Sequence, residues 1–145
     1  MQHNVYSDAY LKEVLKGSRI IALVGASNRT HRASYSVMSY MQSLGYHVIP
    51  VNPQHVGQVI LGETVVERLV DIDSQIDMVD IFRNSEAAGL VVDDAIAVGA
   101  KSVWMQIGVR NDPAAKRAEA AGLKVVMDRC PKIEIPRLFS QGEKG

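Results

Sequence analysis

The sequence predicts a doubly wound α/β fold with a five-stranded parallel sheet, folded as a single domain over residues 1–145. Three features indicate this class. Apolar, strand-like runs alternate with helix-like stretches, and such crossovers build parallel sheets with helices on both faces. The apolar runs are nearly continuous, as expected of strands that are covered on both faces. A chain of 145 residues, 47% of them hydrophobic, is long enough for one full core and too short for two domains.

The elements follow in a regular order. A helix is expected first, over residues 8–16, because its apolar residues recur at helical spacing and Gly17 can end it. Three later helix-like stretches close on Gly45, Gly99 and Gly122, which suit a left-handed helix C-cap, and a strand follows each of them. The five strands are expected at residues 20–25, 47–52, 78–83, 102–107 and 124–128.

Helix starts are marked as well. Asn84 or Ser85 can cap the helix after the third strand, and Asp112-Pro113 favours a helix start after the fourth. Residues 57–70 are expected to form a short strand and a helical turn that cover an edge of the sheet. The tail from Gln141 is expected to be loose.

The first strand ends in an outline typical of a phosphate site. The turn Gly25-Ala26-Ser27-Asn28 follows the apolar run, and the next positions hold Arg29, His31 and Arg32 but no acid. Free backbone N–H groups at the start of a following helix attract anions. The turn therefore predicts a site for a phosphorylated small molecule.

Ligands of such sheets bind at the carboxyl ends of the strands, where the strand order changes direction. This rule predicts that five polar, small or basic segments meet in one crevice. They are residues 25–27, 52–53, 82–84, 106–108 and 129–131.

Composition narrows the classes of partner. The net charge is zero, with 16 residues of each sign, so neither a general nucleic-acid surface nor an acidic tail is expected. Residues 1–60 nevertheless carry five Lys or Arg against two acids, a surplus of three positive charges in the part that contains the turn. No segment is long and apolar enough to suggest a membrane span or a signal peptide, and we expect a cytoplasmic protein.

An NAD site is disfavoured by the residues after the second strand. Such sites carry Gly-x-Gly-x-x-Gly and an acid about 20 residues later that holds the ribose hydroxyls. This turn has Gly25 alone, and no acid occurs from Gln42 to Gly62. A ligand with an extra phosphate on its ribose suits this neutral strand end, with Arg29, Arg32 or His55 nearby.

Six segments in order resemble the stand-alone CoA-binding proteins of bacteria, which are similar to the Rossmann-like domain that opens the alpha subunit of succinyl-CoA synthetase. The resemblance covers the chain from about Tyr10 to Leu138. It rests on Ile20-Ala-Leu-Val-Gly-Ala-Ser27, Arg32-Ala-Ser-Tyr35, Val48-Ile-Pro-Val-Asn-Pro53, Val79-Asp-Ile-Phe-Arg83, Trp104-Met-Gln-Ile-Gly108 and Met127-Asp-Arg-Cys-Pro131.

The resemblance implies a binding site for CoA or an acyl-CoA. Backbone amides of Gly25, Ala26 and Ser27 would hold the phosphates, with Arg32 and Ser34 beside them. Val51, Asn52 and Pro53 would lie by the adenosine, and Gln106, Ile107 and Gly108 by the pantetheine arm. Where the synthetase domain has a lysine after its second strand, this chain has Gln54 and His55.

We expect binding without intrinsic catalysis, and assign no catalytic residue and no metal ligand. Ordinary ion pairs or hydrogen bonds are expected for Asp77, Asp80 and Asp128, and a core position for Trp104. Cys130, the single cysteine, is expected to be a small buried residue, with reactivity toward the CoA thiol as the alternative. Three other functions stay open: an NAD(P)-linked oxidoreductase, a partial acyl-CoA ligase acting with a separate subunit, and a ligand-sensing interaction module. The protein partner is not predicted.

Overall fold

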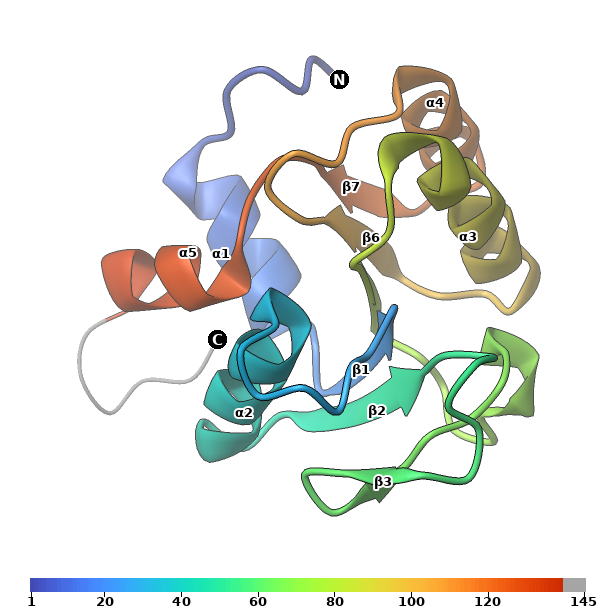
Figure 1. Cartoon of the computed structure of the whole chain (residues 1–145). Coiled ribbons are helices and arrows are strands. Elements are labelled where there is room, and N and C mark those ends of the chain that lie inside the picture. Colours follow the sequence, from blue (N-terminus) through green and yellow to red (C-terminus); the bar gives the residue numbers. More distant parts are fainter. Residues whose placement is uncertain (140–145) are drawn as a thin grey trace.

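The computed structural model describes residues 1–139, and its central sheet is the one that the sequence predicts (Figure 1). Five parallel strands lie in the order β2-β1-β5-β6-β7. Their bounds are β1 Ile20–Val24, β2 His47–Val51, β5 Met78–Ile81, β6 Ser102–Met105 and β7 Lys124–Val126. The five helices are α1 Asp8–Lys16, α2 Ala33–Ser43, α3 Ser85–Ala97, α4 Asp112–Ala120 and α5 Pro131–Leu138.

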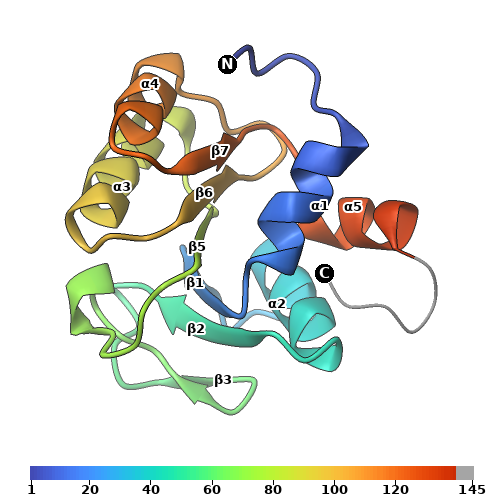
Figure 2. The ribbon, with the colours of Figure 1, turned by 180° about the vertical axis from the view of Figure 1, so that it is seen from behind.

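Helices cover both faces of the sheet, as a doubly wound fold requires (Figures 1 and 2). Helices α1, α2 and α5 cover one face, where Leu23 and Trp104 belong to the buried cluster. Helices α3 and α4 cover the other face, which has a second buried cluster around Val79 and Val103. The core is thus divided by the sheet into two layers, and the strands between them are almost entirely buried.

The strand order changes direction between β1 and β5. The chain leaves β1 through α2 and returns on one side as β2, whereas it leaves β5 through α3 and returns on the other side as β6. Val24 of β1 is paired with Val51 of β2 and Ile81 of β5. The loops after β1, β2 and β5 therefore leave the sheet at the same edge.

The sequence signals for helix ends are confirmed. Helix α1 spans the predicted residues, and the Asn84 side chain accepts a hydrogen bond from the Ala87 amide at the start of α3. Gly45, Gly99 and Gly122 have φ values of 96°, 72° and 90°, in the left-handed region expected after a helix. Each of these turns sends the chain back toward the sheet.

Two segments differ from the expectation. Residues 57–70 contain a small antiparallel pair, β3 Val59–Ile60 and β4 Glu63–Thr64, before the expected helical turn η1 Leu69–Asp71. A bridge between Val66 and Val51 places this segment along the edge of β2, so the expected covering of the sheet edge is confirmed. Helix α5 was not predicted from the sequence. The expected loose tail lies outside the described residues.

Candidate functional site

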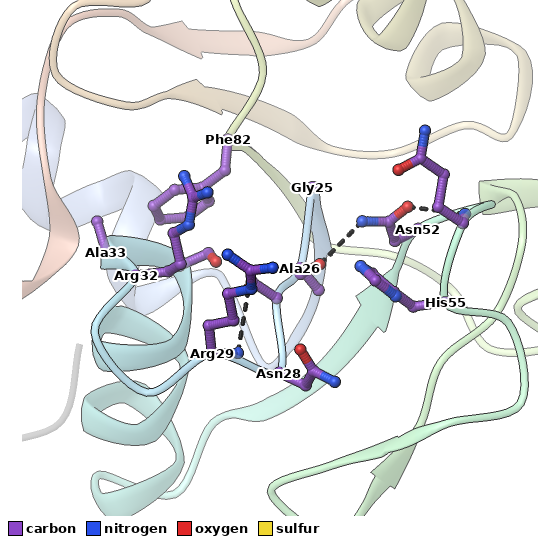
Figure 3. A pocket seen from close by; sticks show the side chains of 12 residues that line it. Gly25, Ala26, Asn28, Arg29, Arg32, Ala33, Asn52, His55 and Phe82 are labelled. Carbon is purple, nitrogen blue, oxygen red and sulfur yellow. Dashed lines mark hydrogen bonds between the residues drawn. The ribbon is translucent and has the colours of Figure 1, made fainter.

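A pocket of about 470 Å³ opens at the carboxyl ends of β1, β2 and β5, where the strand order changes direction (Figure 3). It has the size of a small-molecule site. The turn after β1, the start of α2, the segment after β2 and Phe82 after β5 all contribute to its lining. The lining residues are Gly25, Ala26, Ser27, Asn28, Arg29, Arg32, Ala33, Ser34, Asn52, Gln54, His55 and Phe82.

Only glycine fits at the first position of the turn. Gly25 has a φ of 90°, which L side chains rarely adopt, and a Cβ there would lie 2.3 Å from the carbonyl oxygen of Phe82. The end of β5 therefore lies directly against the turn. This close approach is what brings β1 and β5 together at the site.

The amides of the turn are used differently from what the resemblance implies. Gly25 and Ala26 line the pocket, but their N–H groups donate to the carbonyl oxygen of Val51, at 3.0 and 3.4 Å. The Asn52 side chain adds a hydrogen bond of 2.9 Å from its Nδ2 to the carbonyl oxygen of Ala26. These bonds hold the turn on the end of β2. The Ser27 amide has no acceptor in the part of the chain that the structure describes.

Further free amides come from the start of α2. Arg32 occupies the N-cap position, and its side chain makes no capping hydrogen bond. No acceptor for the Ala33 and Ser34 amides is found within residues 1–139, and both residues line the pocket. First-turn amides of a helix need a partner and carry the positive end of its dipole. The pocket thus contains a helix end with free first-turn amides, an arrangement that suits an anion.

The charges around the pocket have the same sign. Arg29 and Arg32 line it, both are exposed, and no Asp or Glu is among the lining residues. In Figure 3 the two arginines lie on one side of the turn, and Asn52 and His55 lie on the other. A guanidinium can hold two phosphate oxygens with parallel hydrogen bonds. The site is therefore suited to a phosphorylated ligand.

His55 offers a further unused group. Its Nδ1 is buried and has no hydrogen-bond partner in the described chain. The side chain points from the segment after β2 toward the turn (Figure 3). Buried polar atoms in folded proteins are nearly always paired, so this nitrogen of a pocket residue remains available for a hydrogen bond.

The pocket brings together six of the residues expected to bind a cofactor: Gly25, Ala26, Ser27, Arg32, Ser34 and Asn52. The other five expected residues, Val51, Pro53, Gln106, Ile107 and Gly108, are not among its lining residues. The expected cofactor-binding set left out Asn28, Ala33 and Gln54. It also left out Arg29, His55 and Phe82, which the sequence analysis had placed near the ligand or in the crevice without assigning them to binding. The helix start signal could have identified Ala33, because the residue after an uncapped N-cap presents a free amide.

The loop after β6 lies beyond this pocket, at the ends of β6 and β7. Gln106 is 7% exposed and its Oε1 has no partner among the described residues, whereas Ile107 is 58% exposed. The Gly108 amide donates to Asp128 Oδ1 at 2.7 Å and is thus occupied. The Gln106 side chain and the exposed side chain of Ile107 are therefore the groups of this loop that are available to contact a ligand.

Asp77, one of the three aspartates singled out in the sequence, has a structural role. Asp77 accepts hydrogen bonds from the Arg19 and Ile20 amides and pairs with Lys101, as expected of a structural carboxylate. Burial alone would raise its pKa, but these partners outweigh it and hold the pKa of Asp77 below its usual range.

The expectation for Asp80 is wrong, because this carboxylate has neither an ion pair nor a hydrogen bond with any residue from 1 to 139. It is fully buried, and neither oxygen has a partner within the described residues. Burial raises the pKa of Asp80 well above its usual range. Trp104 and Cys130 are buried as expected, and Cys130 precedes the first turn of α5. Residues 1–139 contain no cluster of three His, Cys, Asp or Glu side chains that could hold a metal ion.

Comparison with known proteins agrees with this geometry. Residues 19–136 match a protein family described as a CoA binding domain. The chain belongs to the CoA-binding domain family. YneT of Bacillus subtilis (strain 168), an uncharacterized protein, is similar to this chain, with 39% identity over 127 residues that cover 88% of this chain and 93% of YneT.

Two solved structures are similar to this chain over nearly their whole length. A hypothetical protein from Pyrococcus horikoshii OT3 has 37% identity and a TM-score of 0.87, and the match covers 95% of this chain and 99% of that protein. The cell-free ID.343 protein from Thermus thermophilus has 34% identity and a TM-score of 0.87, with 92% and 100% covered.

The fold also occurs as part of a larger enzyme. A dinucleotide-forming acetyl-coenzyme A synthetase 1 from Ca. Korarchaeum cryptofilum aligns with 79% of this chain and 27% of its own length, with 21% identity and a TM-score of 0.67. This identity supports a shared fold alone. None of the described helices of this CoA-binding domain is long and apolar enough to cross a membrane.

Proposed function

We propose that this protein binds coenzyme A or an acyl-CoA in the pocket beside Gly25, with the diphosphate at the start of α2. The observation that carries the proposal is the uncapped N-terminus of α2, in a pocket that Arg29 and Arg32 also line. An anion there would accept hydrogen bonds from the free amides of Ala33 and Ser34 and pair with the two guanidinium groups. Membership of the CoA-binding domain family supports CoA as the source of that anion.

The orientation follows the expectation from the sequence. We place the adenosine half toward Asn52 and His55, after β2, and the pantetheine arm toward Gln106 and Ile107, after β6. Two observations support this arrangement. His55, whose Nδ1 has no partner in the described chain, lies on the β2 side, where a 3′-phosphate would meet it. The exposed apolar Ile107 lies on the β6 side, where an uncharged arm would pass.

A binding role without a reaction of its own is part of the proposal. The pocket is lined by cationic side chains, backbone amides and small side chains. Such groups bind a phosphate through hydrogen bonds and charge, with no covalent bond made or broken. The cytoplasm, where CoA is a common metabolite, is the compartment that we propose for such a protein.

Calorimetric titration with CoA, dephospho-CoA, NAD and NADP tests this proposal. CoA should bind most tightly. Replacement of Arg32 by Ala should weaken CoA binding by about 1–3 kcal/mol, as for loss of a charged hydrogen-bond partner. Arg19→Ala is the matched control, because Arg19 is an exposed arginine at the opposite end of β1. Tighter binding of NAD than of CoA, or equal binding by wild-type protein and Arg32→Ala, would contradict the proposal.

A further inference from the structure

A third arginine borders the Gly25 turn from the side of β5. Arg83 comes two residues after the end of β5, and its Cδ lies 3.3 Å from the place that a Cβ on Gly25 would occupy. The guanidinium group is bonded directly to this Cδ. Arg83 is exposed, so its charged end is free to contact a ligand that crosses the turn.

Arg83 differs from the arginines that stabilise the fold, because it forms no ion pair with a described residue. Arg110, Arg117 and Arg137 each have a carboxylate partner within 3.1 Å. Arg83 has no ion pair or side-chain hydrogen bond with any residue of the described chain. Its stem is held against a turn that accepts no side chain, while its charge is left without a partner.

The position of Arg83 in the sheet decides which part of a ligand it would meet. The part of the pocket with Asn52 and His55 lies on the β2 side of Gly25 (Figure 3), and the loop that begins at Gln106 lies on the β6 side. Strand β5 lies between β1 and β6. A ligand that extends from the pocket toward Gln106 must therefore cross the end of β5, beside Arg83.

We infer that Arg83 binds the phosphate of CoA that carries the pantetheine arm, and that it makes the site selective for a diphosphate over a single 5′-phosphate. This inference rests on the proposed function and its orientation. Two linked phosphates carry adjacent negative charges. Arg29 and Arg32 approach the diphosphate from the α2 side, and Arg83 approaches it from the β5 side. A guanidinium matches the paired oxygens of a phosphate.

Three ligands and two variants test the inference by calorimetry. CoA and dephospho-CoA contain the diphosphate, whereas adenosine 3′,5′-bisphosphate lacks the pantetheine-side phosphate. Arg83→Gln should weaken binding of CoA and dephospho-CoA about tenfold to a hundredfold, and binding of the bisphosphate less than about twofold. Arg19→Gln, the matched control at the opposite end of β1, should change none of the three affinities. Thermal melting of each variant checks that it remains folded.

The outcomes separate this inference from the proposed function. If the wild-type protein fails to bind CoA, the proposed function falls, and this inference with it. If the wild-type protein binds CoA and Arg83→Gln binds it equally well, the inference alone is overturned. Equal weakening of all three ligands also overturns it, because Arg83 would then contact the adenosine side.

Discussion

The unpaired carboxyl of Asp80 should make the protein less stable as the pH rises. Asp80 lies in the middle of the central strand β5, between Leu23 of β1 and Trp104 of β6. It is fully buried in an apolar layer, and the described residues offer no hydrogen-bond partner to either oxygen. Burial disfavours the ionised form and raises the pKa of this carboxyl well above its usual range.

The direction of the effect follows from proton binding. In the unfolded chain the pKa of an aspartic acid is about 3.9, whereas Asp80 in the folded protein keeps its proton to higher pH. The native state therefore binds more protons than the unfolded state above that pH. The free energy of unfolding should fall by up to about 1.4 kcal/mol per pH unit, until the pH reaches the folded pKa.

Two variants measure this contribution. Asp80→Asn keeps the shape of the side chain and removes its ionisation. The free energy of unfolding of this variant, relative to that of the wild-type protein, should therefore increase as the pH rises above about 4. Asp80→Val replaces an unpartnered polar group by an apolar one in a strand. It should raise the free energy of unfolding at pH 7 by about 1–3 kcal/mol, the cost of one unsatisfied buried group.

Urea unfolding at several pH values between about 4.5 and 8 is the assay, within the range over which carboxyl ionisation is linked to stability. Asp94→Asn is the control, because Asp94 is an exposed carboxylate on α3. A stability difference between Asp80→Asn and the wild-type protein that does not change with pH would refute the reasoning, since Asp80 would then be ionised or paired in solution.

Three further predictions concern the pocket. Gly25→Ala should lower the free energy of unfolding by about 1–3 kcal/mol in thermal or urea unfolding, because its Cβ would collide with the Phe82 carbonyl and its φ is left-handed. His55→Gln should reduce the preference for CoA over dephospho-CoA in calorimetry, with His31→Gln, an exposed histidine outside the pocket lining, as the unaffected control. Arg32→Ser should raise the free energy of unfolding by about 0.5–2 kcal/mol by capping α2, and weaken CoA binding at the same time.

The fold was predictable because its signals are local. Strands buried on both faces need continuous apolar runs, and left-handed helix ends need glycine, so Gly45, Gly99 and Gly122 divide the sequence into its units. Helix α5 was missed because its signals conflict: Pro131 suits a first helical position, whereas Pro136 lies inside the helix. Packing against α1 and α2, which the sequence does not show, favours the helix.

The site was predictable in position and less so in its bonding. Gly25 and the arginines after it mark the turn, because a close approach and an anion each require a particular residue type. The use of the Gly25 and Ala26 amides by Val51 depends on how the end of β2 lies against the turn. Arg83 was expected at the crevice with residues 82–84, but its close approach to Gly25 was not predicted, since this depends on the pairing of β1 with β5.

The uncapped start of α2 links stability and binding at one residue. A serine or aspartate at position 32 would accept the free helix amides and stabilise the helix, but it would occupy the groups that an anion needs. Arg32 leaves these amides free and places a positive charge beside them. The Val51 and Asn52 hydrogen bonds meanwhile hold the turn in place without a ligand. The start of α2 therefore lacks a side-chain cap, and an anion bound there would accept the hydrogen bonds of its free amides.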